Sequence, residues 1–470
     1  MLYSKDRFED GGYRLAVKKE QAQRASVGIS LVPLVCFFLY FAWSCVLPID
    51  QAPDEATRLG IPFYIAQNGA LPSGFEESLR NQIWGISYAF TPYGSSLLSA
   101  VFVKAAMILG AGDVTQVVAA RLSSCIFGSL TVFVLMLICV ELEFDRLTAT
   151  VAGAVLGFLP QFAFLSSYLN NDIFSAFCAA MVVLGWIRGF RRGWDVGPCA
   201  FLGAAIGLLS LSYYFAYGLI PISIFVFFAS ARRLGVSWGG CFRRAGVVFV
   251  VAFAIGGWFF VRNALIYSGD FLGMRSYSEC AELYAQQEYR PSVHQTLKMS
   301  GEFIMSPLFD STWLWMTFRS CVAYFGYMAY PIAEFLYLPF IVFCCVGLAL
   351  PVIAKGRLVP ISGHGRLGNG CFADKLLVVA LIAAAVSPVV FSAYRSWATD
   401  WEPQGRYIVS AWIAVAVLWA WGFDCLVRRI GTSVLRRALA VAPVVLVALM
   451  LCVCSAAVFY PYGFAGIVRT

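Results

Sequence analysis

Eleven apolar stretches recur along this chain, each close to the roughly 17 to 25 residues that a helix needs to cross a lipid bilayer. The composition agrees, because 60% of the residues are hydrophobic and only 13% are charged, a smaller charged share than a soluble domain carries. We therefore expect an all-α, polytopic membrane protein with about 11 transmembrane helices, formed by residues 1–470 as a single multi-pass domain. The expected spans are 28–47, 117–140, 148–166, 173–190, 197–213, 216–231, 245–266, 333–353, 376–394, 407–427 and 438–459.

Clusters of Lys and Arg between the spans set the expected topology. Cytoplasmic loops of membrane proteins collect these residues, so the clusters should share the cytoplasmic side with the amino terminus. The first span follows a basic segment and shows no small-residue cleavage site, which indicates a retained anchor. No Asn-x-Ser/Thr sequence occurs, which favours a bacterial plasma (inner) membrane. The clusters are Arg188, Arg191 and Arg192; Arg232, Arg233, Arg243 and Arg244; Lys355, Arg357, Arg366 and Lys375; and Arg428, Arg429, Arg436 and Arg437.

Residues 95–112 are a further apolar segment that hydropathy alone does not separate from a span. A crossing here would place every later basic cluster on the outer side, against the positive-inside rule. The apolar side chains cover one helix face, an arc of roughly 140° at 100° per residue. Lys104 at the centre of a span would cost roughly 2.5–3.5 kcal/mol. We expect an interfacial helix within a first extracytoplasmic loop at 48–116; a second long outer loop covers 267–332.

An acidic pair, Asp54 and Glu55, follows Pro53 directly after the first span in "PDEATR". Proline restricts its own backbone and that of the residue before it. A carboxylate fixed near the membrane surface suits a general base or a metal ligand. The alternative is a helix start, where acidic residues interact favourably with the helix dipole. The local sequence leaves both interpretations open.

A second acidic position lies in "SYLNNDIFSAF", where Asn171 and Asp172 fall in a very short connection between two spans. Asp172 there is a candidate site residue, and the alternative is a helix cap. Together with Asp54 and Glu55, Asp172 would offer hard oxygen ligands for Mg²⁺ or Mn²⁺. The same three carboxylates are therefore the candidate metal ligands.

Two further polar stretches lie on the expected outer side. "GWFFVRNALIYSGD" places Arg262 within the end of a span, where an ionisable residue is costly and usually functional, with snorkelling as the alternative; Asp270 ends this stretch. "TDWEPQGRYIVS" places Arg406 before the next-to-last span. Its planar guanidinium suits a phosphate, and the alternative is anchoring at the membrane interface. Glu402, Gln404 and Tyr407 accompany Arg406.

The order of these elements resembles the GT-C superfamily of polyprenyl-phosphate-sugar-dependent glycosyltransferases, which includes protein O-mannosyltransferases and the lipid A aminoarabinose transferase. The likeness is closest to a bacterial multi-spanning family of unassigned function with "PDE…H", "NND", "W..RN" and "QGRY" elements, and it covers roughly residues 28 to 410. One departure concerns Arg58, which stands where relatives often have His. Only His294 and His364 occur in the chain, so a histidine metal site is not expected.

The resemblance implies an inverting enzyme that moves a sugar from a polyprenyl-phosphate donor to an acceptor hydroxyl at the extracytoplasmic face. Asp54 would be the general base with Glu55 beside it, and Asp172 the second acidic position, next to Asn171. The implied partners are the lipid-linked donor, a glycan, lipid or protein acceptor, and the bilayer; nucleic acid is not expected. The lipid-phosphate candidates are Arg406, Arg262, Tyr407 and Gln404, and the acceptor or loop candidates are Arg58, Glu402 and Asp270.

Two other function classes share these features. A transporter or flippase of a lipid-linked sugar would show ionisable residues near the bilayer midplane and paired repeats of discontinuous helices, and neither is evident in the sequence. A polysaccharide polymerase or ligase would use the same kind of donor and differ in its acceptor. Most cysteines lie in apolar runs, where they act as small hydrophobic residues. Whether Cys280 and Cys321 form a disulfide is left open by the sequence.

Overall fold

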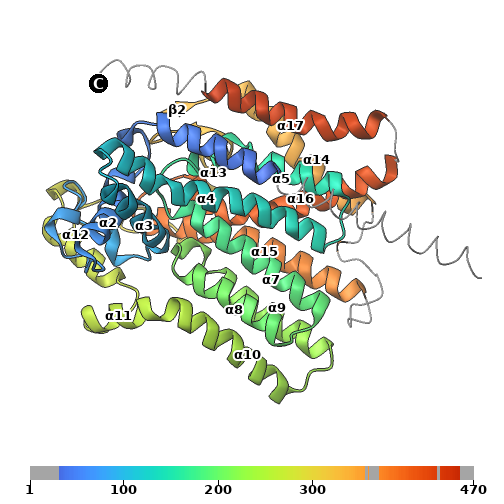
Figure 1. The fold of residues 1–470 in the computed structure, drawn as a ribbon, viewed down its shortest axis with the longest axis horizontal. Coiled ribbons are helices and arrows are strands. Elements are labelled where there is room, and N and C mark those ends of the chain that lie inside the picture. The colour runs from blue at the N-terminus through green and yellow to red at the C-terminus, as the bar shows by residue number, and fades with distance from the viewer. Residues whose placement is uncertain (1–30, 355–357, 359–369, 431–433, 456–470) are drawn as a thin grey trace, which may run out of the picture.

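The computed structural model describes residues 31–354, 358, 370–430 and 434–455, and it is built almost entirely of helices (Figure 1). The strands in this part of the chain are β1 (Tyr324–Phe325) and β2 (Tyr330–Pro331), which pair antiparallel. The expected all-α fold is confirmed. After a first helix at Leu31–Val46, the α-helices are α2 (Glu55–Asn68), α3 (Gly94–Ile108), α4 (Asp113–Glu141), α5 (Arg146–Gly157), α6 (Pro160–Leu165), α7 (Asp172–Arg192), α8 (Val196–Ser210), α9 (Leu219–Arg233), α10 (Trp238–Ala252), α11 (Trp258–Ile266), α12 (Met274–Tyr284), α13 (Ser311–Val322), α14 (Leu338–Ala354), α15 (Gly370–Ala398), α16 (Val409–Ile430) and α17 (Val434–Cys454).

Seven helical segments within the described ranges are long and apolar enough to cross a membrane. Each coincides with an expected span, and the four remaining spans each contain a shorter apolar helix. Hydropathy alone therefore located the helices of the bundle. The seven are Asp113–Glu141, Asp172–Arg192, Tyr214–Arg233, Trp238–Ile266, Glu334–Ile353, Asp374–Ala398 and Gly405–Ile430.

Two of the expected spans differ in form from a single straight helix. The segment 148–166 divides into α5 and α6, because α5 ends at Gly157 and Pro160 opens a new helix as its first residue. The Tyr40 hydroxyl donates a hydrogen bond to the Gly157 carbonyl at the break, 2.7 Å away. The segment expected at 245–266 begins earlier, at Trp238, and contains a short π-helical turn at Phe253–Gly257 between α10 and α11.

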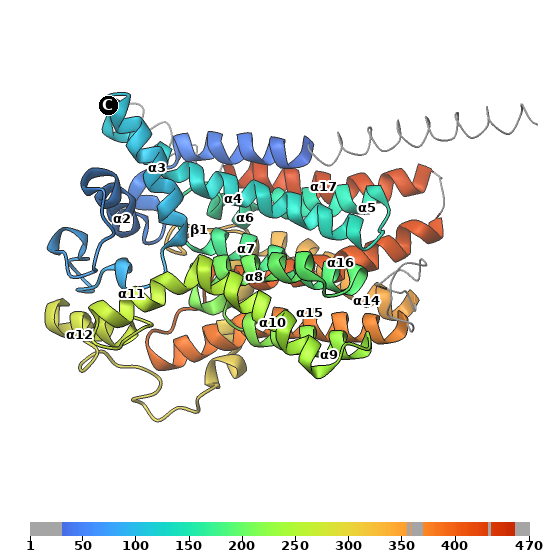
Figure 2. The ribbon, with the colours of Figure 1, turned by 60° about the horizontal axis from the view of Figure 1, so that its bottom comes forward.

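The α3 helix, expected as an interfacial helix over 95–112, turns its serine-containing face inward. Ser95 and Ser99 are buried where α3 packs against α2 and α4, whereas Val101, Lys104 and Ile108 are exposed. The apolar face therefore points away from the protein, as a helix that lies against lipid requires. α3 lies with α2 at one end of the bundle (Figure 2).

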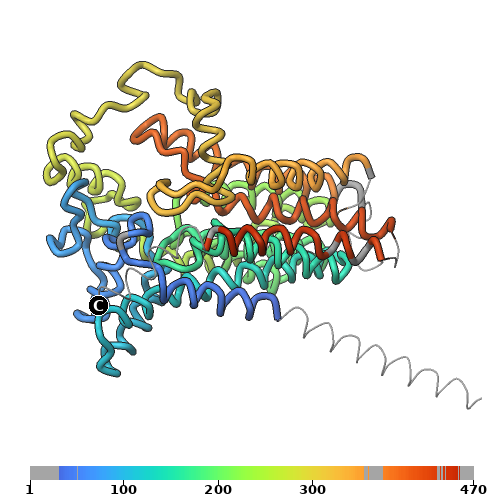
Figure 3. The backbone as a smooth tube through the Cα atoms, turned by 90° about the horizontal axis from the view of Figure 1, so that it is seen from above, coloured from blue at the N-terminus to red at the C-terminus, as the bar shows by residue number. Residues whose placement is uncertain are grey.

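The two ends of the bundle differ in character. We call the end that carries α2, α3, α12 and the connecting segments of 48–94 and 267–337 the loop-rich end (Figures 1 and 3). The opposite end gathers basic side chains from several turns. Glu141 pairs there with Arg188, Arg191 and Arg192.

Two helices run through the interior and begin at the loop-rich end. In an apolar 18-residue stretch of α7, 83% of the residues are buried. The corresponding share is 72% in the Gly405–Ile430 segment and only 17% in Trp238–Ile266. α16 packs against α5, α7, α14 and α15. Side chains at the first residues of α7 and just before α16 are thus held by the best-packed part of the fold.

Candidate functional site

Asp54 precedes α2 in an unusual backbone conformation. Its φ of 63° is left-handed, a region that a non-glycine residue occupies at a cost of about 1–3 kcal/mol. Aspartate tolerates this region better than most residues do. Strain of this kind is concentrated at functional sites. The conformation directs the carboxylate toward Arg406 and away from the dipole-stabilising role that a helix-start acid would have, since it caps no N–H of α2.

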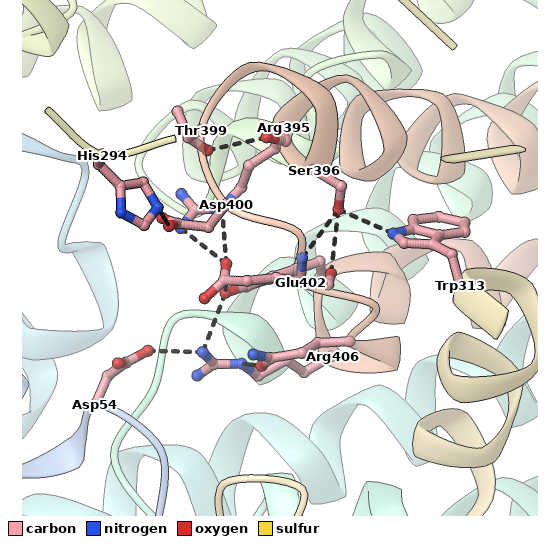
Figure 4. A network of polar contacts seen from close by, with 11 residues as sticks. Asp54, His294, Trp313, Arg395, Ser396, Thr399, Asp400, Glu402 and Arg406 are labelled. Atoms are coloured by element: carbon pink, nitrogen blue, oxygen red, sulfur yellow. Dashed lines mark hydrogen bonds and ion pairs between the residues drawn. The ribbon is translucent and has the colours of Figure 1, made fainter. Parts of the chain in front are cut away.

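Arg406 reaches Asp54 from the opposite side of the site (Figure 4). Its Nη2 lies 2.7 Å from Asp54 Oδ2, and the Arg406 side chain is only 7% exposed while that of Asp54 is 27% exposed. The Nε of Arg406 donates to Gln404 Oε1 at 2.6 Å, and Nη2 lies 3.2 Å from the Tyr407 hydroxyl. Arg406 Nη1 is buried with no hydrogen-bond partner among the described residues. One nitrogen of the guanidinium is therefore free to bind a ligand.

Glu402 extends this network away from Asp54. It accepts a hydrogen bond from the Tyr407 hydroxyl at 2.7 Å and lies 2.9 Å from Arg395 Nη2. The Tyr407 ring stacks on Phe215, with centroids 4.9 Å apart. The structure thus brings the predicted residues Asp54, Glu402, Gln404, Arg406 and Tyr407 together, and it adds Arg395 to them.

A contact between His294 and Asp400 ties the long loop before α13 to the same region. His294 Nε2 lies 2.7 Å from Asp400 Oδ1, two residues before Glu402 (Figure 4). The Trp397 indole donates to the Glu302 carbonyl at 2.8 Å. These contacts anchor the 285–310 segment beside the site.

The electrostatic surroundings of Asp54 strongly favour its charged form. Burial opposes ionisation, but Arg406 and Arg58 outweigh it, and hydrogen bonds from Arg406 and Tyr88 add to their effect. The pKa of Asp54 is lowered from 3.8 to about 2. A carboxylate held in this way is a weak base for as long as Arg406 remains its partner.

Arg58 lies one helical turn after Asp54 and points into the same site. Its side chain is 3% exposed, and the guanidinium carbon sits 4.0 Å above the Tyr88 ring centroid. Burial opposes the charge on Arg58, but interactions with Tyr88, Tyr213, Asp54 and Asp172 outweigh it and hold its pKa above the ordinary value. The Nε atom has no hydrogen-bond partner within the described ranges.

Asp172 is the first residue of α7 and is 1% exposed. Neither of its carboxylate oxygens has a hydrogen-bond partner in the part of the chain that the structure describes. It lies within electrostatic reach of Arg406, Arg58 and Asp54. The Tyr168 hydroxyl, buried nearby, likewise has no partner among these residues. Buried polar atoms without partners are rare in folded proteins and are typical of sites that bind a ligand or water.

Glu55, the neighbour of Asp54, points elsewhere. Arg121 holds both of its oxygens, with Nε at 2.8 Å and Nη2 at 2.6 Å, and the Leu169 backbone N–H donates to the same carboxylate at 2.9 Å. Arg121 also donates to the carbonyls of Ser44 and Leu47, both at 2.7 Å. The pair joins the start of α2 to α4, the end of the first helix and the segment before α7. We assign Glu55 a positioning role on this geometry.

Asn171 also lies next to a site residue without joining it. Its side chain accepts a hydrogen bond from Ser95 at 2.6 Å and donates to the Pro92 carbonyl at 2.6 Å. These bonds attach the start of α7 to the start of α3. Asn170 supplies the cap, because its Oδ1 accepts from the Ile173 N–H at 2.9 Å. Asp172 is thereby left free of the capping role that the sequence allowed.

Arg262 and Asp270 lie in a separate part of the loop-rich end. Arg262 Nη2 donates to the Pro72 carbonyl at 2.6 Å, while Asp270 accepts from the Ser276 N–H at 2.9 Å. Within the described residues, neither side chain forms a hydrogen bond or ion pair with Asp54 or Arg406. Among the described residues, Arg262 thus shares no hydrogen-bond or ion-pair partner with Arg406. The thiols of Cys280 and Cys321 are both free.

The three carboxylates expected to hold Mg²⁺ or Mn²⁺ do not converge. Glu55 is bound to Arg121, and Asp54 is bound to Arg406. Among the residues described, no group of three or more His, Cys, Asp or Glu side chains is placed to hold a metal ion. The three-carboxylate metal site is thus not formed by these residues, because arginines take up two of the three ligands.

Sequence reasoning missed several residues of this region. Arg121 is an arginine inside an expected span, a position that usually marks a buried partner, and Arg395 directly follows another. The sequence therefore contained a signal for both Arg121 and Arg395. Tyr88 and Tyr213 come from segments that the chain brings to the site only on folding, and no local pattern distinguishes them.

The bundle shares its fold with solved structures of an oligosaccharyltransferase, so the fold that the resemblance implied is confirmed. The oligosaccharyltransferase of Archaeoglobus fulgidus in its apo form superposes with a TM-score of 0.53 at 16% identity, over 94% of this chain and 55% of that one. The archaeal oligosaccharyltransferase AglB from Archaeoglobus fulgidus, in complex with an inhibitory peptide and a dolichol-phosphate, gives a TM-score of 0.50 at 16% identity, over 93% of this chain and 55% of that one. This chain thus spans little more than half the length of that enzyme.

A third solved structure, ArnT from Cupriavidus metallidurans bound to undecaprenyl phosphate, gives a TM-score of 0.40 at 16% identity, over 85% of this chain and 78% of that one. No family model and no curated protein matches the sequence. At these identities the comparisons define the fold alone.

Proposed function

We propose that this chain is an integral-membrane glycosyltransferase that moves a sugar from a polyprenyl-phosphate donor to an acceptor hydroxyl. The observation that carries the proposal is the contact of Asp54 with Arg406, 2.7 Å apart, beside the buried Asp172 and Arg58 at the loop-rich end. A carboxylate, and a guanidinium with a nitrogen that has no hydrogen-bond partner among the described residues, supply the base and the phosphate contact that such a transfer needs.

The fold supports this donor class. The AglB structure with the same architecture contains a dolichol-phosphate, a polyprenyl phosphate. A donor of this kind has its lipid chain in the bilayer and its sugar at the surface. A site at one end of the bundle, where two interior helices begin, is suitably placed for both parts.

The proposed reaction is a single displacement. Asp54 accepts the proton of the acceptor hydroxyl while that oxygen forms a bond to the anomeric carbon of the sugar. The bond between the anomeric carbon and the phosphate oxygen breaks, and its electron pair leaves with the polyprenyl phosphate, whose charge Arg406 stabilises. One in-line displacement inverts the configuration at the anomeric carbon.

The resting contact between Asp54 and Arg406 gives this reaction an order. When the donor phosphate binds Arg406, its negative charge offsets the guanidinium charge that is the main cause of the low pKa of Asp54. The carboxylate then becomes a stronger base only when the leaving group is in place. We propose that donor binding precedes proton removal for this reason.

The proposed orientation in the membrane is based on the arginines at the end opposite the site. The loop-rich end would face the extracytoplasmic side of a bacterial inner membrane, because the opposite end gathers the arginines that cytoplasmic loops favour. Residues 1–470 would then act as a single multi-pass domain. Labelling of an introduced cysteine beside Glu402 from outside the cell, but not of one beside Arg243, is the expected result.

The direct test is the Asp54→Asn variant in a deletion strain. It should insert and fold normally yet lower transfer by about 10²- to 10⁴-fold, the usual contribution of a general base. The readouts are the mass of envelope glycans and the release of free polyprenyl phosphate by the purified protein. Asp113→Asn, which changes an exposed acid at the start of α4, is the matched control and should behave as wild type.

The release of polyprenyl phosphate also separates transfer from transport. A transporter or flippase moves the lipid-linked sugar without breaking the bond between sugar and phosphate. Wild-type glycans in the Asp54→Asn strain would refute the assignment of the base. Glycan loss in the deletion strain without any release of polyprenyl phosphate by the wild-type protein would refute the transferase itself.

A further inference from the structure

An arginine lies within electrostatic reach of both acidic residues of the site. Arg58 follows Asp54 by one helical turn, its backbone N–H donating to the Asp54 carbonyl at 3.0 Å. Both Asp54 and Asp172 act on its charge, so the guanidinium lies within electrostatic reach of the two carboxylates. A divalent cation shared by Asp54 and Asp172 would have to occupy this same region.

The surroundings hold Arg58 in place. It is 3% exposed, and its guanidinium lies 4.0 Å from the Tyr88 centroid and 5.9 Å from that of Tyr213. A cation above an aromatic face is stabilised by the ring, and more strongly when water is excluded. A side chain held by stacking and burial at the start of α2 is not free to swing out and admit another cation.

The charge balance disfavours a metal ion here. Two carboxylates that could attract a cation are accompanied by two fixed guanidinium groups, those of Arg58 and Arg406. Glu55, which would have added a third ligand, is bound by Arg121. At close range and partial burial, like charges repel strongly, so these residues do not fit a Mg²⁺ or Mn²⁺ site.

The free hydrogen-bonding capacity of the cluster suits an anion. Arg58 Nε and Arg406 Nη1 are both buried with no hydrogen-bond partner among the described residues. Arginine N–H groups form short, charge-assisted hydrogen bonds with phosphate oxygens. Two such groups from α2 and from the segment before α16 can grip one phosphate from two directions.

We propose that Arg58 stands in place of a divalent cation in this site and, together with Arg406, binds the phosphate of the lipid donor. This inference rests on the proposed function and assigns a role to the residue that departs from the pattern of the resembled family. It makes the phosphate grip independent of metal. Arg58 would contact the substrate directly and help to stabilise the departing phosphate.

The first experiment needs no variant. Wild-type protein in lipid nanodiscs is stripped with EDTA, and its binding of a polyprenyl phosphate is measured by native mass spectrometry, with the unphosphorylated polyprenol as the ligand control. Binding should be unchanged by EDTA, and titration with Mn²⁺ followed by electron paramagnetic resonance should show no stoichiometric site. A stoichiometric Mn²⁺ site that Asp172→Asn abolishes, or lipid binding that requires metal, would overturn the inference.

The second experiment removes the charge. Arg58→Gln should weaken binding of the polyprenyl phosphate by about 10- to 100-fold, as loss of one charged hydrogen bond does, without affecting the polyprenol. Arg58→Lys keeps the charge without the planar fork and should fall between Arg58→Gln and wild type. Arg275→Gln, at a side chain that is 79% exposed, is the matched control and should bind as wild type.

These outcomes are separable from the proposed function, because both experiments measure binding and not turnover. A wild-type protein that binds the phosphate through Arg58 yet transfers no sugar would refute the function alone. An active enzyme whose Arg58→Gln and Arg58→Lys variants, monodisperse in detergent, bind the lipid like wild type would refute the role of Arg58 alone.

Discussion

Two acid–arginine pairs begin at adjacent residues of the chain and differ in almost every respect. Glu55 and Arg121 are 0% and 2% exposed, and they are joined by two hydrogen bonds. Asp54 and Arg406 are 27% and 7% exposed, are joined through a single nitrogen of the guanidinium, and leave Arg406 Nη1 without a partner in the described residues. In the first pair every nitrogen of Arg121 is bonded, and we call it the saturated pair. In the second pair one nitrogen of Arg406 has no partner among the described residues.

This difference distinguishes a pair that fixes the fold from a pair that is able to bind a ligand. A buried ion pair in which every guanidinium nitrogen is already bonded has little capacity to bind a substrate, and its contribution is to fix the elements that it joins. A pair with a free donor and partial exposure can bind a ligand through that donor. We therefore propose different roles for the adjacent acidic residues Glu55 and Asp54, although their charges are equal.

The largest expected effect comes from breaking the saturated pair. Arg121→Ala leaves the Glu55 carboxylate buried without its partner, and loss of one member of a buried pair costs about 3–5 kcal/mol. The expected result is a marked fall in the thermal stability of the detergent-solubilised protein, followed by fluorescence or size-exclusion. Arg406→Ala removes a pair that is partly exposed and should lower stability less.

Replacing both members of the saturated pair sharpens this prediction. The double variant Glu55→Leu with Arg121→Met removes both charges at once, and such replacements of similar volume are often neutral or stabilising. It should therefore recover much of the stability that Arg121→Ala loses. A double variant as unstable as the single one would show that the contacts of Arg121 with Ser44 and Leu47 carry the effect instead.

The pair of Asp54 and Arg406 should show the reverse pattern, with a large effect on transfer and a small effect on stability. Arg406→Lys keeps the charge beside Asp54 but not the planar fork, so the fold should persist while transfer falls by about 10²- to 10³-fold, as on losing one transition-state donor. The measurement is the rate of polyprenyl phosphate release beside a melting curve. Equal losses of stability and rate in this variant would contradict the division between the two pairs.

The fold was accessible from the sequence because the hydrophobic free energy that favours membrane insertion is additive along the chain. The free energy of transfer into lipid can be judged for each apolar segment by itself, without knowing which other segments it packs against. The break at Pro160 and the early start at Trp238 were missed because helix boundaries depend on local contacts that hydropathy averages over. The inward serine face of α3 likewise depends on its neighbours.

The site was accessible only in part, since its residues come from segments far apart in the chain. The expected topology put Asp54, Asp172 and Arg406 on the same side of the membrane, and all three do gather at the loop-rich end. Topology could not show that Glu55 turns to Arg121, because nothing in "PDE" distinguishes two adjacent carboxylates. The left-handed backbone of Asp54, which separates their directions, is a property of the folded chain.

The smallest expected effect is the contribution of Asp54 to stability at low pH. Its pKa falls from 3.8 to about 2 on folding, so its contribution is fully present above pH 3.8 and is lost as the pH falls through about 2. A shift of this size corresponds to about 2 kcal/mol at most. Melting curves of wild type and Asp54→Asn should therefore differ at pH 5 and converge toward pH 2, whereas Asp113→Asn should follow wild type throughout. A constant gap between wild type and Asp54→Asn would mean that the ion pair with Arg406 contributes nothing to the folded state, and the contrast with Glu55 and Arg121 would then rest on burial alone.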